Sequence, residues 1–347
     1  MNYLRKLAVI SIVLIPFSLA RAQWVMQESH TTASLRGVHA VNDSIAWASG
    51  TDGTVLRTVD GGSHWQRCAV PPGGEKLDFR GVWAWDGKTA VVMSAGPEDL
   101  SRLYRTTDAC EHWTEEARNT DKDGFWDAIA FSSADPHTGI ILGDPIKGRF
   151  FMMTRSGSGW SVEPEACSAR SGESAFAASN SSVFVFGPGE YVIGTGGKSG
   201  RRVLLSPRLA GIRECLAVSV PVGEESESAG VFSLAFRDAK HGIAVGGDYK
   251  KPADASGTSA STSDGGHHWT AATTPPNGYR SAVAWAAELK AWIAVGTNGS
   301  DISLDDGKTW RPLDNGSWNA LSLPYVVGPS GRIGRLRENT VRIVEGR

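Results

Sequence analysis

Short segments in which apolar and polar residues alternate run along most of the chain, separated by turns that are rich in glycine and polar residues. The first unit contains three such segments, LRGVHAV from Leu35, IAWASG from Ile45 and TVLRT from Thr54. A period of two is that of a β-strand with one buried face, and frequent β-branched residues favour strands further. The same order of segments returns from Tyr279 and again from Trp318. The pattern therefore predicts an all-β protein built from repeated units.

A phrase with the template Ser/Thr-x-Asp-x-Gly-x-x-Trp recurs in these units. It occurs at residues 58–65, 106–113, 262–269 and 303–310, and a degenerate copy ends at Trp160. The aspartate can accept hydrogen bonds from backbone N–H groups and fix a turn, the glycine supplies a positive φ, and the tryptophan opens the next strand. Each phrase is thus predicted to be a hairpin. Its structural residues are Asp60, Trp65, Asp108, Trp113, Asp264, Trp269, Asp305 and Trp310.

Seven units can be counted, with a spacing of about 40–55 residues that is typical of propeller blades. They start near Leu35, Phe79, Phe125, Ala175, Val231, Tyr279 and Trp318. The last unit has three strands before the chain ends, and residues 23–29 begin with the tryptophan-led pattern of an outer strand. We therefore predict a single seven-bladed β-propeller of four-stranded antiparallel blades over residues 23–347. Its ring is closed by the N-terminal strand pairing into the last blade.

The N-terminus has the pattern of a secretory signal peptide. Two basic residues, at positions 5 and 6, precede an apolar run over residues 7–20, and an A-x-A site predicts cleavage after Ala22. Residues 1–22 are thus predicted to be removed, and no membrane span is expected in the mature chain. The mature protein is expected to be periplasmic or secreted.

The net charge and the cysteines bear on the class of ligand and on possible disulfide bonds. The formal net charge is −2, and removal of the basic signal peptide makes the mature chain more acidic, which disfavours nucleic-acid binding. Export permits disulfides, and four cysteines allow three pairings. Pairing of sequence neighbours would connect adjacent blades, and free thiols on outer strands are the alternative. The four residues are Cys68, Cys110, Cys167 and Cys215.

The repeated phrase resembles the Asp-box, or bacterial neuraminidase repeat, of sialidases and other propeller glycosidases. A wider set of phrases resembles bacterial proteins related to the photosystem II stability/assembly factor. These phrases are GDP at 143–145 with GRF at 148–150, FRDAKHG at 236–242, GGDY at 246–249 and YRSAV at 279–283. The resemblance covers nearly all of the mature chain and implies a propeller scaffold. No nucleotide or flavin fingerprint is present in the sequence, so no cofactor is expected.

In a propeller the inner strands surround a channel, and ligands usually meet its mouth. Arg36, Arg80 and Arg280 begin the inner strands of units one, two and six, and Trp126 takes the equivalent place in unit three. Three converging arginines would bind a carboxylate or phosphate through forked hydrogen bonds, as the arginine triad of sialidases does. Alternatively, each arginine serves a repeated structural need by bonding to backbone or to a carboxylate of the neighbouring blade.

A glycoside hydrolase is the alternative function, because two carboxylates at the mouth would provide an acid and a nucleophile or base. The candidate carboxylates are Asp127, Asp144, Glu173 and Asp248. The resemblance to sialidases would instead imply a tyrosine nucleophile backed by a glutamate, Tyr249 or Tyr279 with Glu173. Arg36 is followed by Gly37 and Val38, not by the Ile-Pro of the sialidase start, and this disfavours sialidase activity.

No metal site is predicted. Residues 121–124 echo part of a calcium loop but lack its closing glutamate, and the histidines at 64, 112, 267 and 268 lie in hairpin turns where exposure is expected. We therefore expect a monomeric binding scaffold, with a glycoside hydrolase as the open alternative. Its partner would be an envelope protein or a small anionic or glycan ligand, and the photosystem label itself is not transferred as a function.

Overall fold

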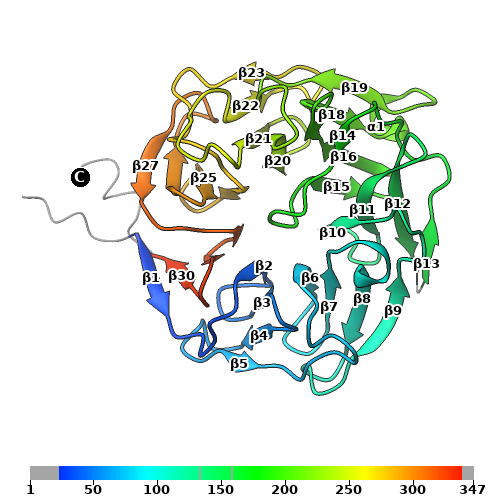
Figure 1. Ribbon diagram of the computed structural model, residues 1–347. Helices are drawn as coiled ribbons and strands as arrows, with labels where there is room; N and C mark the ends of the chain where they lie inside the picture. The colour runs from blue at the N-terminus through cyan, green and yellow to red at the C-terminus, as the bar shows by residue number, and fades with distance from the viewer. Residues whose placement is uncertain (1–22, 133, 158, 338–347) are drawn as a thin grey trace, which may run out of the picture.

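The computed structural model describes residues 23–132, 134–157 and 159–337, and the predicted signal peptide lies outside them. The described chain forms a ring of seven antiparallel sheets around a central axis (Figure 1). Helix is limited to α1 (Pro207–Ala210) and a 3-10 turn at Glu98–Leu100 within the described residues. Neither of them has the length or apolar character needed to cross a membrane. The all-β, seven-bladed propeller predicted from the sequence is confirmed.

Blades 1 to 3 are four-stranded sheets in which each strand pairs with the next along the chain, from the centre of the ring outwards. Blade 1 consists of β2 (Leu35–Ala40), β3 (Ala46–Gly50), β4 (Val55–Thr58) and β5 (Gln66–Arg67). Blade 2 consists of β6 (Phe79–Ala84), β7 (Ala90–Ser94), β8 (Arg102–Thr106) and β9 (Thr114–Arg118). Blade 3 consists of β10 (Trp126–Phe131), β11 (Gly139–Ile146), β12 (Arg149–Ser156) and β13 (Gly159–Val162).

Blades 4 and 5 are linked by two short extra strands. Blade 4 consists of β15 (Val183–Gly187), β16 (Glu190–Gly194), β18 (Arg202–Leu205) and β19 (Leu216–Ser219). Blade 5 consists of β20 (Ala229–Phe236), β21 (Gly242–Asp248), β22 (Ser259–Thr262) and β23 (Thr270–Ala271). The extra strands β14 (Glu173–Ser174) and β17 (Gly196–Gly197) pair with each other, and β17 joins the inner edge of blade 5. Blade 4 thus begins at Val183, later than the predicted start at Ala175.

The ring closes between the two ends of the described chain. Blade 6 consists of β24 (Ala282–Ala286), β25 (Ala291–Gly296), β26 (Gly299–Ser303) and β27 (Arg311–Asp314). Blade 7 consists of β28 (Ala320–Ser322), β29 (Tyr325–Val327), β30 (Ile333–Leu336) and, as its outer strand, β1 (Trp24–Gln27). β1 pairs antiparallel with β30, with Trp24 opposite Leu336 and Gln27 opposite Ile333. The predicted closure by the N-terminal strand is confirmed.

The repeated Asp phrases form tight turns between the third and fourth strands of four blades. In each turn the aspartate Oδ1 accepts a hydrogen bond from the backbone N–H four residues later, at 2.9–3.0 Å. The glycine position has a positive φ, 81° at Gly62 and 95° at Gly266, and Cys110 adopts 66° at the same place. A residue with a side chain is strained in this conformation. The turn of blade 2 is therefore built on a less favourable residue than the others.

Cys110 is also half of a disulfide. It pairs with Cys68, which follows β5, so the bond joins blade 1 to blade 2. Cys167 pairs with Cys215 in the same way and joins the segment after β13 to the segment before β19, that is, blade 3 to blade 4. The sequence neighbours are therefore the partners. Closing loops of 42 and 48 residues restricts the unfolded chain and stabilises the fold.

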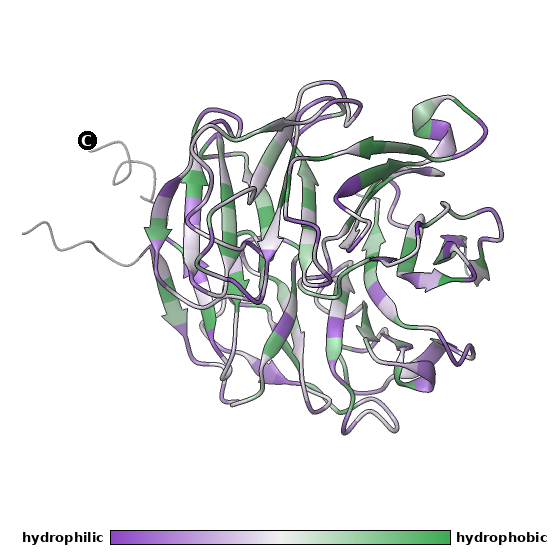
Figure 2. Ribbon diagram, turned by 45° about the horizontal axis from the view of Figure 1, so that its top comes forward, coloured by the Kyte–Doolittle hydropathy of each residue, from purple (hydrophilic) through white to green (hydrophobic). Residues whose placement is uncertain are grey.

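The apolar core lies between neighbouring blades. Figure 2 shows apolar and polar residues alternating along the strands, as the period-two pattern predicts. Large side chains fill the spaces between blades: Trp47 of β3, Phe79 of β6 and Tyr104 of β8 are fully buried in one cluster. Trp65, Trp113 and Trp310 of the turns are buried, whereas Trp269 is half-buried. Inter-blade packing thus holds each sheet at its place in the ring.

Residues 175–182, which precede β15, form a central segment that spans the middle of the ring. The segment forms hydrogen bonds of 2.6–3.2 Å with four other blades. Ala177 O accepts from Arg80 Nη1, and Asn180 Oδ1 accepts from the Ile129 N–H. Ser181 Oγ donates to Ser233 Oγ, and Ser179 Oγ donates to Ser281 O. These partners belong to blades 2, 3, 5 and 6. The central segment therefore gives the channel a floor, and the space above it opens on one face.

Candidate functional site

A cavity of ≈550 Å³ lies above the central segment, where the inner strands begin. We call it the central cavity. The central segment and six of the seven blades contribute to its wall. A volume of this size accommodates a small molecule or a few residues of a peptide. Its lining includes charged and aromatic side chains, namely Arg36, Arg80, Asp127, Asp144, Phe176, Phe232, Tyr249 and Tyr279.

A β-bulge places the side chains that line this cavity. In several blades the pairing of the inner strand with its neighbour skips one residue, between Leu35 and Gly37 in blade 1 and between Phe79 and Gly81 in blade 2. Blades 3 and 5 skip one residue in the same way. The residue left out of the ladder can turn towards the channel, which is how bulges re-aim side chains. The skipped residues are Arg36, Arg80, Asp127 and Phe232.

This bulge corrects the expected role of Trp126. Trp126 pairs with Gly143 in the ladder, is 1% exposed and stacks on Phe151 with ring centroids 6.0 Å apart. Asp127 occupies the skipped position instead. The equivalent place in blade 3 is thus one residue later than the sequence pattern indicated, because the phrase of this blade lacks the arginine that marks the place in blades 1 and 2.

Arg36 and Arg80 provide positive charge at one side of the central cavity. Arg80 donates from Nε to Asp78 Oδ2 at 2.7 Å and from Nη1 to Ala177 O at 3.2 Å. Arg36 makes no hydrogen bond or ion pair with the described residues, and its buried Nε has no partner. Burial, and then the charge of Arg80, lower the pKa of Arg36. An unpaired, half-buried guanidinium that faces a cavity is a site for an anion.

Asp127 and Asp144 form an acidic pair in the same cavity. Asp127 is 2% exposed, and its Oδ2 is buried without a partner. Burial raises the pKa of Asp127 well above its usual value, and the charge of Asp144 adds to this effect. Burial also raises the pKa of Asp144 to about 6, although its carboxylate accepts a hydrogen bond from the Ala175 N–H at 3.2 Å. At neutral pH, therefore, Asp144 is mostly ionised, and burial favours the neutral form of Asp127 more than that of an exposed carboxyl group.

Phe176, Phe232, Tyr249 and Tyr279 form an aromatic wall of the central cavity. Phe176 of the central segment stacks on Phe232 with centroids 3.9 Å apart, and Tyr279 meets the edge of Phe232 at 4.8 Å. Tyr249 stands at the rim and is 47% exposed. Burial raises the pKa of Tyr279, and the charge of Arg36 opposes this rise. The wall offers an apolar surface beside the charged groups.

Arg280 does not join the other two arginines. Its side chain is 1% exposed and forms an ion pair with Asp301 of β26, with Nε 2.6 Å from Oδ2. It also donates to Tyr279 O at 2.7 Å and to Asn298 Oδ1 at 2.6 Å. The expected convergence of three arginines is therefore replaced by two, because blade 6 supplies its own buried carboxylate. Arg280 thus bonds to backbone and to a carboxylate of its own blade, not to one of the neighbouring blade.

Two of the four candidate carboxylates lie away from the central cavity. The side chain of Glu173 is fully buried and accepts hydrogen bonds from Arg202 at 2.6 and 2.7 Å and from Thr195 at 2.6 Å. Asp248 is buried and accepts from Lys250 N at 2.9 Å, which fixes a turn. Asp127 and Asp144 are thus the carboxylate pair that the fold brings together. Glu173 cannot back a tyrosine nucleophile, because Arg202 and Thr195 occupy its oxygens.

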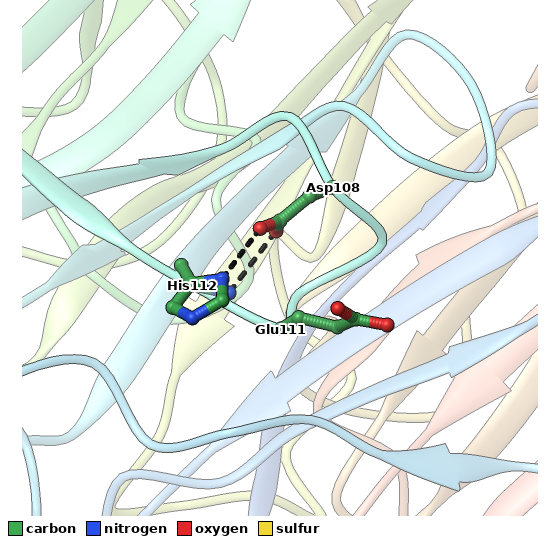
Figure 3. A group of neighbouring side chains, drawn as sticks. All are labelled: Asp108, Glu111 and His112. Atoms are coloured by element: carbon green, nitrogen blue, oxygen red, sulfur yellow. Dashed lines mark hydrogen bonds and ion pairs between the residues drawn. The ribbon is translucent and has the colours of Figure 1, made fainter.

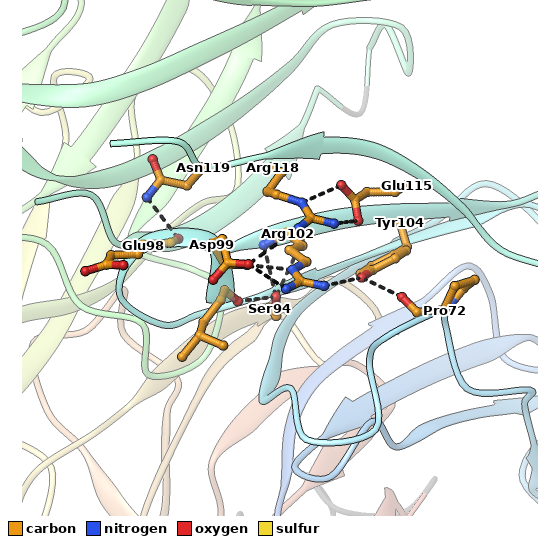
Figure 4. Close-up of polar contacts among 10 residues, drawn as sticks. Pro72, Ser94, Glu98, Asp99, Arg102, Tyr104, Glu115, Arg118 and Asn119 are labelled. Carbon is orange, nitrogen blue, oxygen red and sulfur yellow. Dashed lines mark hydrogen bonds and ion pairs between the residues drawn. The ribbon is translucent and has the colours of Figure 1, made fainter. Parts of the chain in front are cut away.

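Several charged groups on the surface form ion pairs of their own. On blade 2, Arg102 bonds Asp99 at 2.8 Å and Arg118 bonds Glu115 at 2.7 Å, so that cations and anions balance (Figure 4). Asp108, Glu111 and His112 bring three ligand-type atoms within 4.8 Å in an exposed turn (Figure 3). The 2.7 Å contact of Asp108 with His112 recurs between Asp60 and His64 without a glutamate, so it belongs to the turn itself.

The comparisons with known proteins support the fold. No family model and no curated protein match the chain. Among solved structures, YCF48 bound to D1 peptide matches with 17% identity and a TM-score of 0.60 over 92% of this chain and 98% of that one. YCF48 from Cyanidioschyzon merolae matches with 18% identity and a TM-score of 0.64 over 91% and 99%. The WD40 β-propeller domain of Doa1 matches with 12% identity and a TM-score of 0.57 over 91% and 99%. At these identities the likeness concerns the propeller fold.

Proposed function

We propose that this protein is an exported binding scaffold whose central cavity holds a carboxylate or another anionic group of a partner protein or small ligand. Arg36 and Arg80 are the residues that bind this group, and the bacterial cell envelope is where the scaffold acts. Each of the two guanidinium groups has nitrogen atoms that bond to no other part of the described chain. Arg80 retains an unbonded Nη2, and Arg36 makes no bond within the described residues.

The unpaired guanidinium of Arg36 carries this proposal. A half-buried cation without a counter-ion is costly in a folded protein, and structural arginines are normally bonded, as Arg280 is to Asp301. A ligand anion would supply the missing partner, and two arginines on adjacent blades could share it through parallel N–H donors. The charge of Arg80 lowers the pKa of Arg36, which places the two guanidinium groups near each other.

The likeness to YCF48 bound to D1 peptide supports a protein segment as the ligand. It is an example of a propeller of this shape in complex with a peptide. The identity of 17% supports no statement about which partner this chain binds. Only the general role, a propeller that holds a segment of another protein, enters the proposal.

A glycoside hydrolase is the second candidate, and the acidic pair is the observation that favours it. Asp127 and Asp144 lie together in a cavity, and their pKa values are raised by burial, as those of catalytic acids often are. In this case Asp127 would be the proton donor and Asp144 the base or nucleophile. Glu173 and Asp248 have no part in this candidate, because they lie outside the central cavity.

Binding of a simple anion tests the scaffold proposal directly. Hexanoate would be titrated into the wild-type protein, into Arg36→Gln and into Arg208→Gln, with binding followed by ligand-observed NMR. Arg208 is a matched control, since it is exposed and pairs with Glu190 far from the central cavity. We expect Arg36→Gln to weaken binding by about tenfold or more, the value of a charge-assisted hydrogen bond, and Arg208→Gln to change nothing. Equal binding by all three proteins would reject the proposal.

A parallel experiment examines the partner and the enzymatic candidate. Crosslinking in the native envelope would compare the proteins captured by wild type and by Arg36→Gln, and a protein lost only with Arg36→Gln would be a ligand of the central cavity.

A panel of chromogenic glycosides would be offered to wild type and to Asp127→Asn. Turnover by wild type that disappears in Asp127→Asn would establish the hydrolase and displace the scaffold.

A further inference from the structure

The acidic pair is left without a role if the central cavity binds only an anion. Asp127 Oδ2 is buried with no partner, and Asp144 accepts a hydrogen bond from the Ala175 N–H. Arg80 lies close enough to lower the pKa of Asp127, but its bonds go to Asp78 and Ala177. The fold therefore holds two carboxyl groups in a cavity, and no cation among residues 23–132, 134–157 and 159–337 forms an ion pair with them.

A ligand that supplies hydrogen-bond donors would satisfy these oxygens. Carboxylates accept several hydrogen bonds, and an ammonium group offers three donors together with a compensating charge. A neutral donor such as a hydroxyl would leave the ionised carboxylate uncompensated, which is costly in a buried site. The chemistry of the pair thus favours a primary amine.

We propose that the ligand carries an ammonium group as well as a carboxylate, and that Asp127 and Asp144 bind the ammonium while Arg36 and Arg80 bind the carboxylate. This inference rests on the proposed anion site and names the chemical class of its ligand, a zwitterion. Two sources share this chemistry: a free amino acid, and a protein segment with a lysine near its C-terminal carboxylate.

The aromatic wall suits the part of the ligand between the two charges. Phe176 and Phe232 present stacked rings to the cavity, and methylene groups or an aliphatic side chain would bury apolar surface against them. Tyr249 at the rim already has the Lys250 ammonium 6.0 Å from its ring, a geometry that suits a cation over an aromatic face. Both the apolar and the charged surfaces of the cavity are therefore used by one ligand.

A series of ω-amino carboxylates tests this inference, and the distance between the ammonium site and the carboxylate site need not be known beforehand. Straight-chain compounds of increasing length would be compared with alkyl carboxylates of equal length, by calorimetry or ligand-observed NMR. We expect the best amino carboxylate to bind wild type at least about tenfold more tightly than its alkyl partner, as one added charge-assisted hydrogen bond would give. Asp144→Asn and Asp127→Asn should reduce this advantage to below about twofold and leave alkyl carboxylate binding equal or tighter.

Proton release provides a second readout that needs no variant. Binding of an ammonium beside Asp127 and Asp144, whose pKa values are raised by burial, should release protons from this pair, since the cation stabilises the ionised carboxylates. Calorimetry of wild type in buffers of different ionisation enthalpy should therefore show more proton release with the amino carboxylate than with the alkyl carboxylate of equal length. A structural role for the acidic pair would produce no such difference.

The outcomes separate the inference from the proposed function. If alkyl carboxylates bind, are lost in Arg36→Gln, and gain nothing from an amine at any length, the zwitterion is wrong and the anion site stands. If no carboxylate of either series binds, both fail. Peptides with a free C-terminus and a lysine at successive positions, compared with norleucine at those positions, then distinguish a protein segment from a free amino acid. Tighter binding of one lysine peptide than of any small compound supports the segment.

Discussion

Arg36 and Arg280 occupy the same place at the start of an inner strand, yet their environments differ completely. Arg280 is enclosed by Asp301, Asn298 and the Tyr279 carbonyl, whereas Arg36 has no such partner. The difference arises from the second and third strands of each blade, which supply a carboxylate in blade 6. At the scale of the residue, the place in the repeat therefore predicts the backbone position of an arginine but not the groups to which its side chain bonds.

This difference predicts opposite effects on stability. Arg280→Ala leaves the Asp301 carboxylate buried and unpaired, so we expect the free energy of unfolding to fall by about 3–5 kcal/mol. Arg36→Ala removes an unpaired, half-buried cation and should leave that free energy unchanged or slightly higher. Urea unfolding followed by tryptophan fluorescence measures both. A similar loss in the two variants would mean that Arg36 has a structural partner after all.

Asp144 predicts a pH dependence for both stability and anion binding. Its pKa in the folded protein, about 6, lies above the ordinary value of 3.8. Ionisation thus costs stability as the pH rises from about 4 through 6, and the negative charge then opposes an anion at the neighbouring arginines. The other titratable groups around Asp144 and the two arginines are Asp127, Asp78 and Tyr279, besides Arg36 and Arg80 themselves. Below pH 6 the cavity therefore favours anions more strongly.

The measurement uses hexanesulfonate, an anion that stays ionised throughout the pH range. We expect several-fold tighter binding at pH 5 than at pH 7.5 in wild type, as the loss of one nearby negative charge would give. In Asp144→Asn the affinity should be nearly constant over this range. A wild-type affinity that does not change with pH would contradict the raised pKa.

At the scale of the element, the repeated turn is fixed by its aspartate. Asp264 accepts from the His268 N–H at 2.9 Å, from Thr262 Oγ1 at 2.9 Å and contacts His268 Nδ1 at 2.6 Å. Asp264→Ala removes these bonds, and we expect the free energy of unfolding to decrease by about 1–2 kcal/mol. Glu225→Ala, at an exposed loop position, is the control. If the two variants are equally stable in thermal unfolding, the turn does not depend on the aspartate.

The central segment is the element that gives the cavity its floor. Asn180 accepts from the Ile129 N–H at 2.7 Å and donates to Val82 O at 3.4 Å, so it ties blade 4 to blades 3 and 2. Ala177 of the same segment bonds Arg80, and Phe176 belongs to the aromatic wall. The position of this segment therefore sets the geometry of the binding residues.

Loosening the segment should weaken binding without touching the ligand. Asn180→Ala leaves the Ile129 N–H buried and unpaired, which costs about 1–3 kcal/mol of stability. We expect hexanoate affinity to fall in this variant, since the floor no longer holds Ala177 and Phe176 in place. Ser171→Ala, in the exposed connection before β14, serves as the control. Unchanged affinity in a destabilised Asn180→Ala protein would show that the floor has no part in binding.

At the scale of the whole molecule, the ring depends on a short N-terminal strand. Trp24 of β1 is 2% exposed, lies against Trp318 with centroids 6.0 Å apart, and donates from Nε1 to Ser300 Oγ of blade 6 at 3.2 Å. β1 thus holds blade 7 to blade 6 and covers the edge of β30. A propeller without this strand would expose that edge to other chains.

Two substitutions in β1 distinguish an effect on ring closure from the effect of any substitution in this strand. Trp24→Ala should destabilise the protein by about 3–5 kcal/mol and promote association through the uncovered edge. Met26→Ala, on the same strand but 56% exposed, should change neither stability nor association. Denaturant unfolding and light scattering after gel filtration report the two properties. Equal behaviour of both variants would mean that closure does not rest on Trp24.

The likeness to solved propellers also belongs to this scale. Structures with 12–18% identity match more than nine-tenths of the chain, which indicates that the arrangement of blades is shared although most side chains differ. The residues of the central cavity therefore carry the argument about function, and the shape of the molecule only places them together.

The sequence alone determined the architecture of this protein. The period-two alternation, the turn phrases and the unpaired last unit predicted seven blades and closure by residues 23–29, because strands and hairpin turns depend on local backbone preferences. Arg36 and Arg80 were also identified from their repeat position. The four cysteines allowed three pairings, and sequence could not choose among them because their distances depend on how the blades lie.

Tertiary structure decided which side chains meet in the central cavity. The bulge that selects Asp127 over Trp126 has no sequence signature in blade 3. The carboxylate that removes Arg280 from the cavity comes from another strand, and the segment predicted as an inner strand from Ala175 became the floor instead. This segment reads AFAASNSS, and hydrogen bonds to four other blades hold it across the ring. Such contacts join residues far apart in the chain, so no local pattern records them.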